Sequence, residues 1–167
     1  PSAEQQQIID SVAAFLAAEL PLARLRPGSD GERSGDICIS AELWQRMAGL
    51  GWFGLGIPEG RGGAGLTVVE EMLLAREVGR YAASPAIAAT ITAAHLAVRG
   101  DRDLLENLVA GKQRVAIASR LCAGSDECHL LDARGAGYCL VVDGSEARLY
   151  GTAAFDEVRA VISLDDA

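Results

Sequence analysis

Residues 50–71 of the chain read Leu50-Gly51-Trp52-Phe53-Gly54-Leu55-Gly56-Ile57-Pro58-Glu59-Gly60-Arg61-Gly62-Gly63-Ala64-Gly65-Leu66-Thr67-Val68-Val69-Glu70-Glu71. Glycines are interspersed there with large apolar residues. Because glycine has no Cβ, it lets backbone segments approach closely and adopts positive φ angles without strain. A flexible linker would instead be polar throughout. The stretch therefore predicts a compact, packed connection, in which we expect Gly63 to require a positive φ angle.

A helix is predicted directly after this connection. Thr67-Val-Val-Glu70 has the form of a capping box, in which the threonine hydroxyl and the glutamate side chain satisfy free backbone donors. Gly60, Gly62 and Gly65 also match the bare GxGxxG spacing of phosphate-binding loops. Such a loop follows a strand, whereas the residues before this one look like a helix that ends at Leu50-Gly51. A packed turn between two helices is therefore favoured, and a nucleotide-binding loop is the alternative.

The order of residues around the turn resembles the N-terminal helical domain of the acyl-CoA dehydrogenases. The matching elements are Trp44, Leu50-Gly-Trp-Phe-Gly-Leu55, Ile57-Pro-Glu59, Gly62-Gly-Ala-Gly-Leu66 and a helix that begins with glutamates. Glu77-Val-Gly-Arg80 and Ser84-Pro85 are similar to the end of that family's next helix and to the turn after it. The resemblance covers residues 2–119, and it implies an α-helical bundle that is followed by a β domain.

Beyond residue 119 the resemblance points to a cofactor segment. The family carries Thr-Glu-Pro-x-x-Gly-Ser-Asp beside its flavin, and residues 119–126 here read Ser-Arg-Leu-Cys-Ala-Gly-Ser-Asp. The resemblance therefore implies FAD as the cofactor and Ser119, Gly124 and Ser125 as residues that contact it. Arg-Leu stands here in place of the family's Glu-Pro, and the family's tryptophan on the following strand has no counterpart.

By resemblance, the function is that of an acyl-CoA dehydrogenase-like flavoprotein, which removes two hydrogens from an acyl-CoA thioester. In this family a carboxylate base takes the α proton while the β hydrogen leaves as hydride to the flavin. The base lies in a C-terminal helical domain that this chain does not contain, so no catalytic residue is assigned here. The alternative is a degenerate, non-catalytic subunit, or a helical interaction module, that pairs with an active acyl-CoA dehydrogenase subunit. Both interpretations imply a homo- or hetero-oligomer.

Composition narrows the classes of function. The chain has 167 residues, half of them hydrophobic, and a formal net charge of −8. Nucleic-acid binding is not expected, because it depends on basic clusters and Lys112 is the only lysine. No apolar stretch reaches the length of a bilayer span, so we expect a cytoplasmic protein that does not enter the membrane. The four cysteines form no CxxC pair and the histidines are too few for a usual zinc set, so we expect no metal site.

The predicted fold class is mainly α with a smaller β part, divided into an α-helical domain at 1–112 and a partial β domain at 113–167. Apolar spacing and capping residues predict helices at 2–20, 41–50, 68–81, 86–98 and 101–110. Runs of β-type residues predict strands at 115–119, 138–142, 147–150 and 158–163, with a hairpin turn at Asp143-Gly144. These strands would form an incomplete antiparallel sheet.

Further expectations concern individual side chains on the predicted helices. On the helix at 68–81, the inward face is expected to hold Met72, Leu73, Ala75, Val78 and Ala82. Glu70 and Glu71 are explained by their place at the start of that helix, where exposed amides favour negative charge. The helix at 86–98 is nearly apolar all round, so burial on several sides is expected. His95, on that helix, is expected to be a hydrogen-bonded core or interface residue rather than a catalyst.

Overall fold

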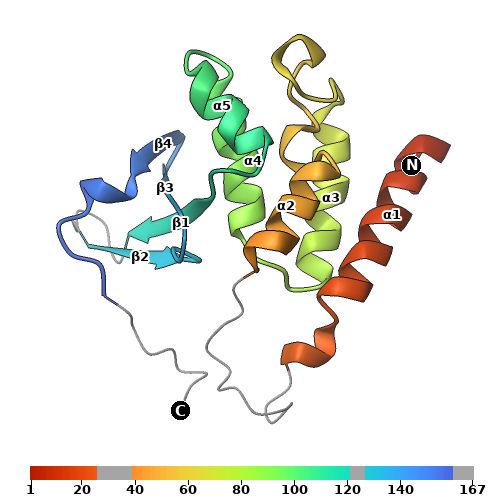
Figure 1. Ribbon diagram of the computed structural model, residues 1–167, viewed down its shortest axis with the longest axis horizontal. Coiled ribbons are helices and arrows are strands. Elements are labelled where there is room, and N and C mark those ends of the chain that lie inside the picture. The colour runs from red at the N-terminus through yellow and green to blue at the C-terminus, as the bar shows by residue number, and fades with distance from the viewer. Residues whose placement is uncertain (26–38, 121–126, 160–167) are drawn as a thin grey trace.

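The computed structural model describes residues 1–25, 39–120 and 127–159 of the chain. Over these residues five α-helices come first and a four-stranded sheet follows (Figure 1). The helices are α1 (Ala3–Glu19), α2 (Ala41–Gly49), α3 (Val68–Arg80), α4 (Ala86–Ala97) and α5 (Arg102–Val109). The strands are β1 (Val115–Arg120), β2 (Cys128–Leu131), β3 (Tyr138–Asp143) and β4 (Glu146–Gly151). The predicted class, mainly α with a smaller β part, is confirmed.

Short 3-10 turns and side-chain caps set the ends of these elements. The 3-10 turns are η1 (Leu22–Leu25), η2 (Trp52–Gly54), η3 (Glu59–Arg61) and η4 (Thr152–Ala154). Capping side chains begin four of the helices: Ser2 for α1, Ser40 for α2, Thr67 for α3 and Asp101 for α5. Such caps satisfy backbone donors that the first turn of a helix leaves free. The cap at Thr67 is the capping box predicted with Glu70.

The sheet is mixed rather than wholly antiparallel as expected. Its strand order is β2-β1-β3-β4, in which β1 pairs antiparallel with β2, β3 pairs antiparallel with β4, and β1 and β3 run parallel. Strand β2, which the sequence patterns did not predict, carries the chain back along β1, so that β3 starts again beside Val115. Parallel neighbours need a crossover connection of this kind. Of the strand expected at 158–163, Val158 and Arg159 are not in a strand, and the rest lies outside the described residues.

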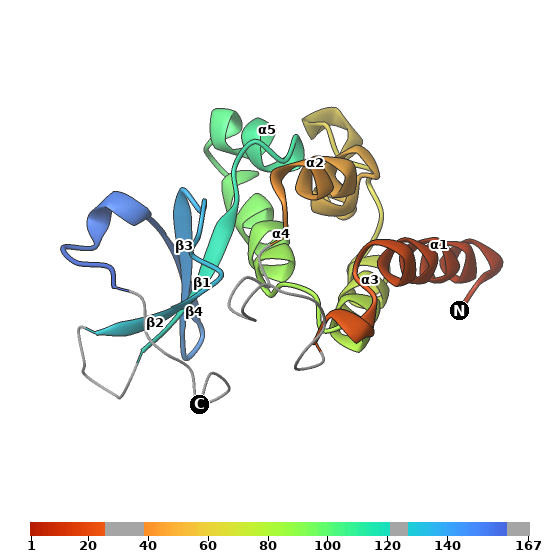
Figure 2. The same cartoon turned by 60° about the horizontal axis from the view of Figure 1, so that its bottom comes forward.

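Helix α4 is the central element of the molecule. It lies between the sheet and helices α2 and α3 in both ribbon views (Figure 1, Figure 2). One apolar cluster joins α4 to α1, α2, η2 and α3, and its fully buried members include Leu16, Met47 and Phe53. A second cluster joins α4 to α5, β1 and β3. Because both sides of α4 are covered, the predicted burial of this apolar helix on several sides is confirmed.

Polar contacts also hold the helices to the sheet and to the connections that lead into it. The backbone N–H of Val115 donates to Thr90 Oγ1 at 3.2 Å, and the Gln45 amide donates to the Gly111 carbonyl at 2.7 Å. The Ser84 hydroxyl donates to the Asp132 carboxylate. Thr90 is fully buried, so its hydroxyl provides the partner that a buried N–H requires. The sheet is therefore fixed against α4 and α2 by packing and by hydrogen bonds.

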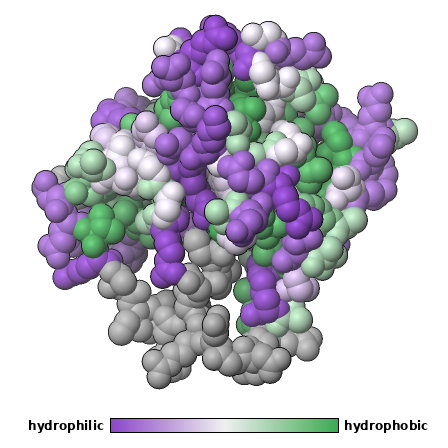
Figure 3. All heavy atoms as spheres, in the orientation of Figure 1, coloured by the Kyte–Doolittle hydropathy of each residue, from purple (hydrophilic) through white to green (hydrophobic). Residues whose placement is uncertain are grey.

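Helix α3 presents a different inward face from the one expected. Val78 is buried as predicted, but Met72 is 59% exposed and Ala82 is exposed as well. The buried residues of the helix are Glu70, Glu71, Leu74, Glu77 and Val78. Figure 3 shows exposed apolar atoms on the side of the molecule where α1 and α3 lie in Figure 1. The prediction of this inward face was wrong, because a prediction from the spacing of apolar residues places every glutamate on the outward face of the helix.

The buried glutamates of α3 are tolerated because each has polar partners. Glu77 is 1% exposed, and its carboxylate lies 2.9 Å from the Arg76 guanidinium and 3.4 Å from the Arg80 guanidinium. Glu70 accepts hydrogen bonds from the Thr67 backbone N–H and hydroxyl and from the Gln5 side chain. A buried charge that is paired and hydrogen-bonded avoids most of the penalty for leaving water.

Acid should weaken the capping box of α3 in a defined pH range. The hydrogen bonds from Thr67 and Gln5 lower the pKa of Glu70 from 4.5 to about 2. Because the folded-state pKa is depressed, the stability that Glu70 contributes is present above pH 4.5 and is lost as the pH falls toward 2. We expect Glu70→Gln to be less stable than the natural chain at neutral pH, with the difference shrinking across this range.

Chemical denaturation at a series of pH values measures this effect. The matched control is Glu42→Gln, which changes an exposed glutamate in the first turn of α2. Its difference from the natural chain should stay nearly constant over the same range. A Glu70→Gln difference that also stays constant on acidification would show that the capping carboxylate does not have a depressed pKa.

Candidate functional site

The glycine-rich turn between α2 and α3 folds back on itself through its own backbone. The N–H groups of Ala64, Gly65 and Leu66 donate to the carbonyls of Gly54, Ile57 and Leu55 at 2.8–2.9 Å. These donors are therefore occupied within the turn and are not directed at a ligand. In the described residues 39–67, helix α2 precedes the turn, the 3-10 turns η2 and η3 lie within it, and there is no strand. The nucleotide-binding alternative is wrong, because it requires both a preceding strand and free amides.

The glycines of the turn serve two different purposes. Gly62 and Gly65 adopt left-handed φ angles of +88° and +65°, which favour glycine. Gly63, expected to have a positive φ, does not have one. It is needed for close approach instead, because a Cβ at this position would lie 2.1 Å from the Ile57 carbonyl oxygen and 2.5 Å from the Gly54 carbonyl oxygen.

Glu71 connects the turn to two helices. Its Oε1 accepts the backbone N–H of Gly56 at 3.0 Å, and its two carboxylate oxygens lie 2.8 and 3.0 Å from Nε2 of His95 on α4. The glutamate side chain is 7% exposed, whereas that of His95 is 42% exposed. A Cβ on Gly56 would lie 2.5 Å from the Glu71 carboxylate, so the turn approaches this side chain as closely as glycine allows.

This contact is an arrangement that sequence reasoning missed. Glu71 was expected to be explained by exposed amides at the start of α3, yet its carboxylate is buried against Gly56 and His95. The expected hydrogen bond of His95 is confirmed. Nothing in local sequence spacing connects these residues, since they lie on a turn and on two separate helices. The arrangement positions the turn between α3 and α4, which is a structural role for all three residues.

Of the residues implied to contact a flavin, the structure describes Ser119. It is exposed near the C-terminal end of β1, where it pairs with His129 of β2. Gly124 and Ser125 lie outside the described residues. The neighbouring Arg120, which stands where the family has glutamate, lies 3.6 Å from the Asp143 carboxylate. The assignment of these three residues to a cofactor site stays a prediction.

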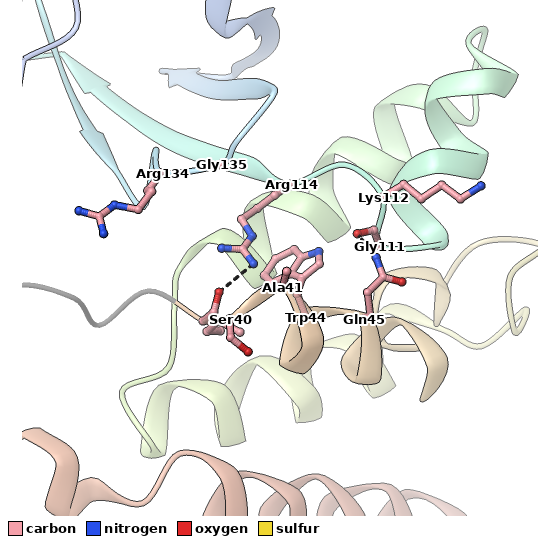
Figure 4. Close-up of a pocket in the computed structure, with 10 residues that line it drawn as sticks. Ser40, Ala41, Trp44, Gln45, Gly111, Lys112, Arg114, Arg134 and Gly135 are labelled. Atoms are coloured by element: carbon pink, nitrogen blue, oxygen red, sulfur yellow. Dashed lines mark hydrogen bonds between the residues drawn. The ribbon is translucent and has the colours of Figure 1, made fainter.

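A pocket of about 510 Å³ lies between helix α2 and the connections that precede β1 and β3 (Figure 4). Its walls come from the start of α2, the connection from α5 to β1 and the connection from β2 to β3. Lining residues that carry polar groups are Ser40, Trp44, Gln45, Lys112, Arg114 and Arg134. Arg114 donates to the Ile39 carbonyl at 2.9 Å, and its guanidinium lies 4.3 Å from the centroid of the Trp44 ring. None of these residues was predicted from the sequence to belong to a binding set.

Metal-ligating side chains and membrane-spanning helices were sought among the described residues. Among the described residues, no group of three or more His, Cys, Asp and Glu side chains could hold a metal ion. Cys128 and Cys139 are free thiols, and burial raises the pKa of the Cys139 thiol. None of the described helices combines the length and apolar character needed to cross a bilayer.

Comparison with known proteins adds a family and a set of solved structures. The profile of the family "Acyl-CoA dehydrogenase, N-terminal domain" matches residues 2–109. No curated protein sequence matches the chain.

Solved structures share the fold over most of the chain at low sequence identity. The ChsE4-ChsE5 complex from Mycobacterium tuberculosis matches with a TM-score of 0.63 and 18% identity, covering 90% of this chain and 48% of that one. PigA with FAD and proline matches with a TM-score of 0.62 and 21% identity, covering 91% and 49%. Butyryl-CoA dehydrogenase from Megasphaera elsdenii matches with a TM-score of 0.59 and 19% identity, covering 91% and 49%. The chain therefore spans about half the length of the solved structures that it matches.

Proposed function

The chain belongs to the acyl-CoA dehydrogenase family, and from this membership we propose that it is part of an FAD-dependent enzyme that dehydrogenates an acyl-CoA thioester between its α and β carbons. The observation that carries the proposal is the family match over residues 2–109, which β1 and, further along the sequence, Gly124-Ser125-Asp126 follow. We propose that the helical domain ends at 112 and that a partial β domain occupies 113–167.

In the proposed enzyme this chain positions the reactants and does not supply the base. No carboxylate of the chain matches the family's base, which a further part of the protein would provide. Ser119, Gly124 and Ser125 would contact FAD, which when bound supplies the acceptor for the hydride. Ser119 fits this role because its side chain is exposed near the end of a strand that packing on α4 holds in place. Its hydroxyl can donate one hydrogen bond and accept others, as contact with a flavin ring requires.

Flavin binding by the intact protein that contains this chain tests the proposal. We expect purified protein to carry FAD that acyl-CoA bleaches, and Ser119→Ala to weaken FAD binding about 5- to 10-fold, as loss of one hydrogen bond does. The matched control is Ser145→Ala, on the exposed turn between β3 and β4, which should leave FAD affinity unchanged. Protein without flavin and without acyl-CoA-dependent bleaching would contradict the proposal.

A second candidate is a non-catalytic subunit that pairs with an active one. Arg120 favours it, because this residue stands in place of the family's glutamate and lies beside Asp143 of the sheet. The ChsE4-ChsE5 structure is a complex of this fold, which supports assembly with a different chain. The mass of the purified complex and its flavin content distinguish the candidates. A hetero-oligomer with FAD bound only by the other subunit would establish the second and exclude the first.

A further inference from the structure

The outward face of helix α3 exposes a group of large apolar side chains. Of the ten large apolar side chains that are exposed in the described residues, four lie close together in the sequence and are 38–64% exposed: Leu66, Val68, Val69 and Met72. Val68 and Val69 precede Met72 by four and three residues, so these three side chains are neighbours on the helix surface. Apolar residues that are exposed singly are ordinary, whereas a contiguous group of them is typical of an interaction site.

The same face of α3 carries positive charge toward its C-terminal end. Arg76 and Arg80 follow Met72 by four and eight residues, so they continue its line along the helix. Their side chains are 50% and 68% exposed, and both pair with the one buried carboxylate of Glu77. Two cations on one anion leave a net positive charge at this end of the face.

A negative charge lies at the opposite end of the face. Glu59 is exposed in η3, and its side chain lies against the residues that lead into α3, because a Cβ on Gly65 would be 3.2 Å from Glu59 Cγ. Gly65 precedes Met72 by seven residues, while Arg80 follows Met72 by eight. Similar steps from Met72 in the two directions therefore reach opposite charges, with apolar side chains between them.

We propose that this face binds the same face of a second copy of this chain, with the two α3 helices antiparallel about a twofold axis near Met72. In that arrangement the apolar side chains of the two copies bury one another, and Arg80 approaches the partner's Glu59. Antiparallel helices also bring the partial charges at their ends close to partial charges of opposite sign. A chain of different sequence would need the same order of charges, whereas a second copy provides it by symmetry.

The α3 face is remote from the flavin contact proposed for Ser119. Ser119 belongs to the sheet, and α4 lies between the sheet and α3 (Figure 2). The inference therefore does not rest on the proposed function. Flavin content tests the proposed function and the mass of the assembly tests the inference, so either can fail while the other holds.

Sedimentation velocity of the intact protein tests the inference. We expect an assembly with an even number of copies. Met72→Asp should weaken the association at least about 10-fold and halve the mass, because two carboxylates would then meet near the axis. Since Met72 is 59% exposed, this change should leave the circular dichroism spectrum unaltered. Val142→Asp is the matched control: Val142 is 61% exposed on β3, and its replacement should leave the mass unchanged.

Charge exchange tests the antiparallel arrangement. Glu59→Arg should weaken the association about 5-fold, because it places like charges together in two symmetry-related pairs. Adding Arg80→Glu to this variant should restore the association, while Glu77 keeps Arg76 as its partner. A natural protein that sediments as a single copy, or an assembly that Met72→Asp leaves whole, would overturn the inference. So would a double variant that associates no more tightly than Glu59→Arg, or release of a different chain by Met72→Asp in place of a second copy.

Discussion

Gly63→Ala is expected to lower the free energy of unfolding by about 3 kcal/mol or more, the upper range for overpacking a tightly packed site. The added Cβ would lie 2.1 Å from the Ile57 carbonyl oxygen and 2.5 Å from both the Gly54 carbonyl oxygen and Ile57 Cβ. Two of these neighbours are backbone atoms, which cannot rotate away as a flexible side chain can. The same carbonyls accept the N–H groups of Gly65 and Ala64, so any shift that relieves the clash weakens the turn.

Thermal melting with a neighbouring glycine as control measures this effect. For a chain of this length a loss of this size corresponds to a fall in melting temperature of roughly 6 °C or more. Gly60→Ala is the matched control, because Gly60 lies in the same turn, has no positive φ, and would place its Cβ at least 4 Å from any other group. We expect Gly60→Ala to change stability by less than about 0.5 kcal/mol. If both variants melt together, the packing of the turn around Gly63 is looser than these distances indicate.

The sequence located this turn but could not assign a purpose to each glycine. Glycine is required both where the backbone has a positive φ angle and where another group lies too close for a Cβ. The sequence shows glycine in either case, and only the folded backbone distinguishes Gly62, which has a positive φ, from Gly63, which is closely approached. The helices were predictable because their signals are local. A cap such as Ser40 or Thr67 and the apolar spacing after it lie within one segment, and the predicted bounds agree with the structure to within two residues.

The inward face of α3 was not predictable, because it depends on partners far away in the sequence. Glu70 is buried beside Gln5 of α1, and Glu71 is buried beside Gly56 and His95. Apolar spacing places every glutamate outside unless its partners are known, so the pattern selected Met72 as an inward residue.

Non-local pairing limited the prediction of the sheet in the same way. Strands β1, β3 and β4 carry β-type runs or a hairpin turn, whereas β2 is a four-residue strand that, among the described strands, pairs with β1 alone. The parallel pairing of β1 and β3 follows from that intervening strand.

Of the candidate sites, Ser119 was predicted from the resemblance to a family. The pocket at Trp44 and Lys112 was not predicted, because it joins segments that no local motif connects.

Glu71→Ala is expected to lower the free energy of unfolding by about 2–3 kcal/mol, the combined effect of an unsatisfied buried donor and a lost charged hydrogen bond. The substitution removes a buried carboxylate that accepts from Gly56 and contacts His95. It leaves the Gly56 N–H without a partner between two helices. Glu71→Gln retains an oxygen that can accept from Gly56, so we expect it to lose about 1 kcal/mol.

A double-mutant cycle of Glu71→Ala with His95→Ala measures how much of the lost stability comes from the contact between Glu71 and His95. Because the two side chains are in contact, their effects should be non-additive, with a coupling energy of about 1 kcal/mol. Glu106→Ala serves as control: Glu106 pairs with Arg102 on the surface, so its removal should cost about 0.5 kcal/mol or less and respond to added salt. The Glu71 effect should persist at high salt, because a buried pair is screened far less than an exposed one. Additive losses for Glu71 and His95, or a Glu71 loss that salt abolishes, would mean that the turn is held by packing alone and that the carboxylate is only a surface charge.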